Sequence, residues 1–136
     1  MFGDDVEEAT GHLRFFLLYL LAGIAAGLVH TFRDPQSMTP LIGASGAIAG
    51  VVGAYVLLLP RAKIVVLLLG IVPIRLRAIW VVSIWLALQV LGILVPQMHG
   101  GISYWGHVAG FVAGCLVLLV LRRADVPLLG RWHGNT

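Results

Sequence analysis

The apolar run over residues 41–60 constrains this 136-residue chain more than any other stretch. It reads LIGASGAIAGVVGAYVLLLP and carries no charge. As a helix it would reach roughly 28 Å at about 1.5 Å per residue, which is close to the hydrocarbon thickness of a bilayer. Gly46, Gly50 and Ala54 recur every four residues, and such a face of small residues lets other helices approach closely. We therefore expect a transmembrane helix at the centre of a bundle.

Composition also indicates an integral membrane protein. The chain is 60% hydrophobic and 11% charged, and a soluble domain of that composition could not cover its own surface. The basic residues lie at the ends of apolar runs instead of forming a polar cluster, so we expect no nucleic-acid partner. No group of His, Cys, Asp and Glu has metal-ligand spacing, and we expect neither a metal nor another cofactor. The sequence does not indicate the oligomeric state.

Three further apolar runs are long enough to cross a membrane. With the first, they predict an all-α, polytopic bundle of four spanning helices at about 13–31, 41–59, 78–95 and 102–121. Small-residue faces recur in two of these helices, with Gly23 and Gly27 in the first and Gly106, Gly110 and Gly114 in the last. The shorter apolar segment 64–74 is expected at the membrane interface, or as a short hairpin dipping into it, and no β-strands are expected.

The basic residues predict how the bundle is oriented. Four crossings place both termini on one side, together with the loop between the second and third helices. That side carries Arg61, Lys63, Arg75, Arg77, Arg122, Arg123 and Arg131, whereas the two opposite loops carry Arg33 alone. The positive-inside rule then makes both termini cytoplasmic, and we expect a location in the plasma membrane. Because the second and fourth helices run in the same direction, Ser45 and His107 are expected at the same depth near the outer face.

These two residues have the chemistry of a nucleophile and its base. Ser45 lies in the first turn of the central helix, where the amides of Ser45 and Gly46 could stabilise an oxyanion. A neutral imidazole at His107 could take the proton of the Ser45 hydroxyl. The alternatives are that the serine hydrogen-bonds a carbonyl one turn back, and that the histidine only bridges helices. Gln89, in the third helix, needs a polar partner inside the bundle.

Two motifs and the acidic lead resemble the rhomboid intramembrane serine proteases. GASGA at residues 43–47 is similar to the nucleophile motif of that family, and GHVAGF at 106–111 is similar to its base motif. The lead FGDDVEEATG resembles the segment after the second helix of the family core. The resemblance implies that Ser45 is the nucleophile and His107 the general base of a dyad without an aspartate. It also implies transmembrane protein substrates that are cut within the lipid bilayer.

The chain also departs from the rhomboid pattern. The family core has six helices, and its first two, with a His-x-x-x-Asn motif that helps to form the oxyanion hole, are missing here. We therefore expect a single domain over 1–136 that is N-terminally incomplete, with the glycine face of the central helix turned to lipid. We expect little or no proteolysis from this chain alone. The alternatives are a non-catalytic rhomboid-like protein that binds transmembrane helices and a small structural or channel-like bundle.

Overall fold

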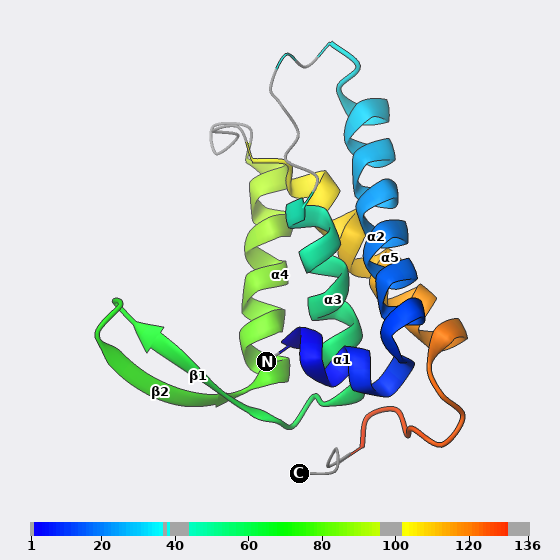
Figure 1. Ribbon diagram of the computed structural model, residues 1–136. Helices are drawn as coiled ribbons and strands as arrows, with labels where there is room; N and C mark the ends of the chain where they lie inside the picture. Colours follow the sequence, from blue (N-terminus) through cyan, green and yellow to red (C-terminus); the bar gives the residue numbers. More distant parts are fainter. Residues whose placement is uncertain (1, 37, 39–43, 96–101, 131–136) are drawn as a thin grey trace.

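The computed structural model describes residues 2–36, 38, 44–95 and 102–130. Its elements are α1 (Phe2–Thr10), α2 (His12–Arg33), α3 (Ala44–Leu58), β1 (Lys63–Leu68), β2 (Val72–Arg77), α4 (Ala78–Leu94) and α5 (Tyr104–Leu121). Helices α2 to α5 form a bundle in which successive helices alternate in direction, so α3 and α5 run the same way (Figure 1). Helix α1 and the β-hairpin lie at one end of the bundle.

Helix α3 is the central helix of the bundle, as its small residues predict. Most of its side chains are buried, from Gly46 near its start to Leu58 at its end. By contrast, α5 buries only one stripe, which consists of Gly106, Gly110, Gly114 and Leu118. Helix α3 can be enclosed because glycine and alanine allow α2 and α5 to approach its backbone closely.

The glycines of α3 and α5 lie in direct backbone contact. A Cβ atom built on Gly110 would lie 2.1 Å from the carbonyl oxygen of Gly46, and one on Gly114 would lie 2.0 Å from that of Gly50. On its other side, Gly46 meets Ala26 of α2, whose Cβ would be 2.3 Å away from a Cβ at Gly46. The glycine face of α3 is therefore packed between α2 and α5, and the expectation that it meets lipid is wrong.

Helix α2 contributes alanines to this contact. Its buried residues are Leu18, Ala22 and Ala26, which are spaced by four positions. Gly23 and Gly27, which the sequence favoured as the contact face, are each one residue further along and only half-buried. The α2 stripe that packs on the bundle is thus rotated by about 100° from the predicted one, because each residue turns a helix by that angle.

Two of the described helices are long and apolar enough to cross a membrane. Helix α2 has 22 residues with a mean hydropathy of 2.0, and α5 has 18 residues with a mean hydropathy of 1.9. Only 17% and 22% of these apolar windows are buried inside the molecule. Large apolar side chains such as Phe16, Ile24 and Leu116 are more than half exposed. Surfaces of this kind require an apolar surrounding, which fits a helical bundle in a membrane.

The segment after α3 forms a two-stranded β-hairpin, so the expected absence of strands is wrong, and the described chain is mostly helical instead of all-α. The strands pair antiparallel, from Lys63 opposite Arg77 to Leu68 opposite Val72. The β-branched residues at 64–66 favour an extended chain. The turn uses positive φ angles at Leu69 (54°) and Gly70 (74°). Residues 64–74 were expected either as an interfacial segment or as a short hairpin, and the structure contains a hairpin.

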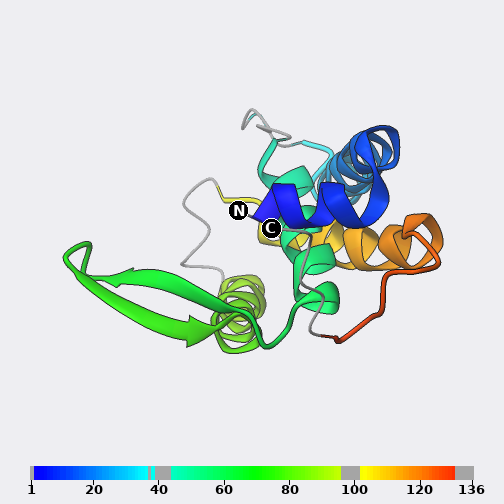
Figure 2. The same cartoon turned by 60° about the horizontal axis from the view of Figure 1, so that its bottom comes forward.

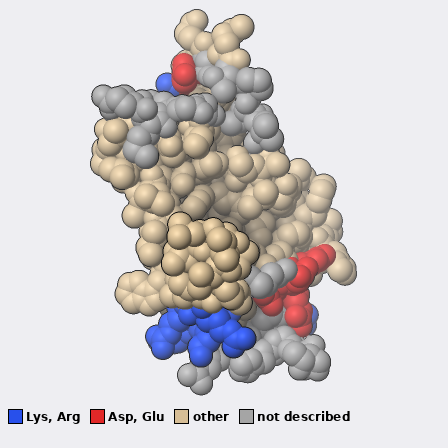
Figure 3. Space-filling view, turned by 90° about the vertical axis from the view of Figure 1, so that its left-hand side faces the viewer, with Lys and Arg blue, Asp and Glu red and all other residues tan. Residues whose placement is uncertain are grey.

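The hairpin has one basic face and one apolar face. Lys63, Arg75 and Arg77 share a face because side chains alternate along each strand, and the opposite face carries only apolar residues. The hairpin projects away from the helices next to α4 (Figure 2). Figure 3 shows most of the Lys and Arg atoms in view in one patch beneath an uncharged surface, and a few others near the top and beside the acidic atoms. The hairpin therefore has the polarity of an element that lies at a membrane interface.

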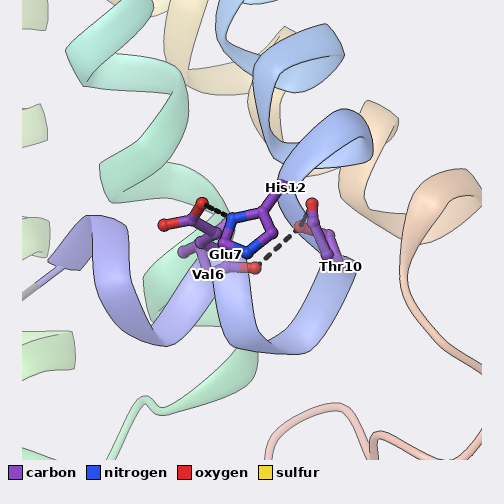
Figure 4. A network of polar contacts seen from close by, with 5 residues as sticks. Val6, Glu7, Thr10 and His12 are labelled. Atoms are coloured by element: carbon purple, nitrogen blue, oxygen red, sulfur yellow. Dashed lines mark hydrogen bonds and ion pairs between the residues drawn. The ribbon is translucent and has the colours of Figure 1, made fainter.

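Polar contacts fix α1 at the same end of the bundle. The Thr10 hydroxyl donates to the Val6 carbonyl at 2.8 Å, and His12 contacts the Glu7 carboxylate across the turn at Gly11 (Figure 4). The amide of Arg123, just after α5, donates to the Ala9 carbonyl at 3.1 Å. The beginning of the described chain and the segment after α5 therefore lie together, at the same end of the bundle as the hairpin.

Candidate functional site

Ser45 lies in the first turn of α3, at the end of the bundle opposite the hairpin. The helix begins at Ala44, and the Ser45 side chain is exposed. The first four N–H groups of a helix have no acceptor within it, and the amides of Ser45 and Gly46 are among these four in α3. Ser45 is thus accessible and lies at the positive end of a helix dipole.

His107 lies in the first turn of α5, at the same end of the bundle. Its ring is half-buried and faces α4, where the ring centroid of Trp85 is 6.0 Å away. Its Nδ1 atom lies 2.8 Å from the Oε1 atom of Gln89. The predicted need of Gln89 for a polar partner is confirmed, and that partner is His107.

The backbones of the two predicted motifs meet. A Cβ atom on Gly46 would lie 3.6 Å from the carbonyl oxygen of Gly106, which directly precedes His107. Since Gly50 in turn contacts Gly114, the two helices run in parallel and in register. Ser45 and His107 are each one residue from this contact, so they share a depth in the bundle as predicted.

A second serine–histidine pair lies at the same end of the bundle. The Ser103 hydroxyl and His30 Nδ1 share a hydrogen bond of 2.8 Å. Ser103 is also the N-cap of α5, where its hydroxyl accepts from the Gly106 amide at 3.2 Å. This arrangement accounts for both residues as a link between the end of α2 and the start of α5. From the sequence, only the N-cap preference of serine could have indicated this pair.

An apolar groove runs along the exposed side of α3. It has a volume of about 370 Å³ and is lined by Phe2, Gly3, Phe15, Tyr19, Ile48, Val51 and Val52. Ile48 and Val52 lie three and seven residues after Ser45, so all three share one face of the helix. The groove therefore continues the face on which the candidate nucleophile lies. Within the described ranges, no group of three or more His, Cys, Asp or Glu side chains could hold a metal ion.

Comparisons with known proteins agree with the two motifs. Residues 1–124 match the family profile described as the Rhomboid domain. Over 117 residues the chain is 26% identical to "RHOMBOID-like protein 5" of Arabidopsis thaliana, an alignment that covers 86% of this chain and 36% of the relative. The chain thus spans about a third of the length of the curated relative it matches. No solved structure matches it significantly.

Proposed function

Because the chain belongs to the rhomboid family, we propose that it is an intramembrane serine endopeptidase that cuts transmembrane protein segments. Ser45 is the nucleophile and His107 the general base. The observation that carries the proposal is the backbone contact between Gly46 and Gly106, which puts the two side chains at one depth on neighbouring helices. An exposed serine in the first turn of one helix and a half-buried imidazole in the first turn of its neighbour are the two groups that acyl transfer requires.

The proposed reaction proceeds in two steps. The Ser45 Oγ attacks the carbonyl carbon of the scissile peptide while its proton passes to His107, and the amides of Ser45 and Gly46 stabilise the oxyanion. The imidazolium returns the proton to the leaving amine as the C–N bond breaks. Water, deprotonated by His107, then hydrolyses the acyl-enzyme and frees Ser45. The apolar groove below Ser45 would hold the apolar part of the substrate.

A serine-directed fluorophosphonate probe tests this assignment in the full-length protein. We expect labelling of the wild type, complete loss of labelling in Ser45→Ala, and loss of about 10²- to 10⁴-fold in rate when His107→Ala removes the base. Ser103→Ala is the matched control, because Ser103 also contacts a histidine at the same end of the bundle. It should keep its labelling.

The result also separates the alternatives. Labelling that survives Ser45→Ala and disappears in Ser103→Ala would show that Ser103, and not Ser45, is the nucleophile. No labelling of the correctly folded wild type would favour a non-catalytic rhomboid-like protein that binds transmembrane helices.

We further propose that all four bundle helices cross the membrane, with both termini and the hairpin on the cytoplasmic side. Helices α3 and α4 have 15 and 17 residues, so each reaches only about 22–26 Å, and a locally thinned bilayer would accommodate them. The charge distribution supports this orientation. Arg61, Lys63, Arg75 and Arg77 are exposed at the hairpin end, whereas Arg33 lies at the other end, stacked on the Trp105 ring at 4.4 Å.

Cysteine labelling in spheroplasts tests the orientation. In a Cys115→Ala background, a membrane-impermeant maleimide should label Asp34→Cys from outside and label Arg61→Cys only after the membrane is permeabilised. Both native side chains are exposed, so access to reagent depends on the side of the membrane alone. The opposite labelling pattern would invert the topology, and labelling of both from outside would mean that α3 does not cross.

A further inference from the structure

The buried side chain of Gln89 is unusual for its surroundings. Gln89 is only 7% exposed and lies in α4, a helix that carries no charged residue and whose other buried residues are Ala78, Val82 and Gly92. A polar side chain within a membrane helix costs free energy unless it is hydrogen-bonded, and an apolar residue would pack there at no such cost. Gln89 makes two contacts: its Oε1 lies 2.8 Å from His107 Nδ1, and its Nε2 lies 3.5 Å from the Trp85 carbonyl oxygen.

The contact of Gln89 with the Trp85 carbonyl determines which partner donates in the contact of Gln89 with His107. A backbone carbonyl can only accept a hydrogen bond, so the 3.5 Å contact favours the orientation in which the amide NH₂ of Gln89 points toward Trp85. A flipped amide would place two acceptor oxygens against each other there. The Gln89 oxygen therefore faces His107, and because that oxygen also only accepts, the proton of the neutral imidazole must be on Nδ1. The lone pair of the ring is then on Nε2.

We propose that Gln89 is a positioning residue that holds His107 in the Nδ1–H tautomer and so presents Nε2 as the proton acceptor. This inference rests on the proposed function, in which His107 is the general base. In serine hydrolases with a triad, a carboxylate orients the histidine and also stabilises its charged form. Here a neutral amide supplies the orientation without an ionised carboxylate in a membrane helix, where a charge is expensive. The ring of Trp85, which lies in α4 as Gln89 does, is next to the imidazole of His107 and limits its rotation.

The tautomer can be measured without any enzymatic activity. In the full chain labelled with ¹⁵N-histidine, at a pH about two units above the ordinary histidine pKa of about 6.5, we expect a protonated Nδ1 at His107. A His107→Ala sample assigns the signal among the five histidines. Gln89→Met, which is similar in size but replaces the amide oxygen by a weakly accepting sulfur, should shift His107 toward the Nε2–H form. Gln89→Glu keeps an acceptor oxygen and should keep the proton on Nδ1.

Two results would overturn the inference: an Nε2–H tautomer in the wild type, or an unchanged tautomer in a folded Gln89→Met. If Gln89→Met does not fold, the inference is tested by the tautomers of the wild type and of Gln89→Glu alone, which should both carry the proton on Nδ1. These outcomes do not depend on whether the protein is an enzyme. A wild type that shows the Nδ1–H tautomer but is not labelled by fluorophosphonate would refute the proposed function and leave the role of Gln89 intact.

A reactivity measurement separates positioning from simple packing. The rate of fluorophosphonate labelling at Ser45, per folded protein, should fall at least tenfold in Gln89→Met and at most by the roughly 10²- to 10⁴-fold that a general base contributes. Gln89→Glu should recover much of that rate. A Gln89→Met variant that melts earlier but is labelled at the wild-type rate would reduce Gln89 to a structural link between α4 and α5.

Discussion

Gly110→Leu is expected to prevent the bundle from folding, with a loss of about 3 kcal/mol or more in the free energy of unfolding. A Cβ atom at this position would lie 2.1 Å from the carbonyl oxygen and 2.8 Å from the carbonyl carbon of Gly46. These are backbone atoms in the first turn of α3, and they cannot rotate away as the end of a side chain can. Helices α3 and α5 would have to separate, which also opens the contact that aligns Ser45 with His107.

Thermal denaturation in detergent measures this effect. Gly46→Leu should act similarly, since its Cβ would meet Ala26 at 2.3 Å. Val117→Leu and Val120→Leu are the controls on α5, and Val120 is 80% exposed, so an additional methylene there meets no protein. Melting temperatures that fall equally for the glycine and valine variants would show that α3 and α5 do not pack through these glycines.

The small residues made the centre of the bundle predictable from the sequence. The four-residue spacing of Gly46 and Gly50, and of Gly106, Gly110 and Gly114, predicts two close-packing faces, and the structure joins these faces. The spacing does not reveal that the third partner uses Ala22 and Ala26 instead of Gly23 and Gly27. Both sets have the required period, and the choice between them depends on how α2 is rotated by its neighbours. For the same reason, the sequence did not show that the glycine face of α3 is covered.

The two strands of the hairpin were missed because of its composition. Residues 64–74 are apolar almost throughout, so the alternation typical of a half-buried strand is hidden. The feature of the sequence that indicates a strand is the pair Arg75 and Arg77. These residues are two positions apart, so they lie on one face of a strand. Lys63 lies opposite Arg77 in the hairpin. The amides of Ala78 and Ile79 then donate to the carbonyls of Ala62 and Pro60, which satisfies the first turn of α4.

Within the candidate site, the sequence indicated Ser45 and His107 as candidates, and the structure supplied a partner for His107, which is Gln89. The likeness of the serine and histidine motifs to a known family pointed to Ser45 and His107, and the helix count placed them at one depth. The sequence also predicted that Gln89 needs a polar partner. It could not name that partner, because which residue of α5 faces Gln89 depends on the packing of α4 against α5. The Ser103–His30 pair was missed for the same kind of reason, since two helix ends 73 residues apart meet only in the fold.

Leu18→Ala is expected to cost about 2–5 kcal/mol in the free energy of unfolding, whereas Leu17→Ala should change it by no more than about 0.5 kcal/mol. The two residues are adjacent in α2, so the substitutions alter the same number of atoms and the same helix propensity. Leu18 is fully buried in a cluster with Val51, Tyr55 and Leu118, and its truncation leaves a cavity. Leu17 is 40% exposed on the side of α2 that lipid would cover, and acyl chains can fill the space that its truncation leaves.

Reversible unfolding in mixed micelles, with increasing denaturing detergent, gives both free energies under one condition. The difference between the two variants reports the rotation of α2 directly, because successive residues of a helix point about 100° apart. A larger loss for Leu17→Ala than for Leu18→Ala would mean that α2 packs through the face that also carries Ile24. That rotation would withdraw Ala22 and Ala26 from α3, and the close approach of three helices beneath Ser45 would then be wrong as well.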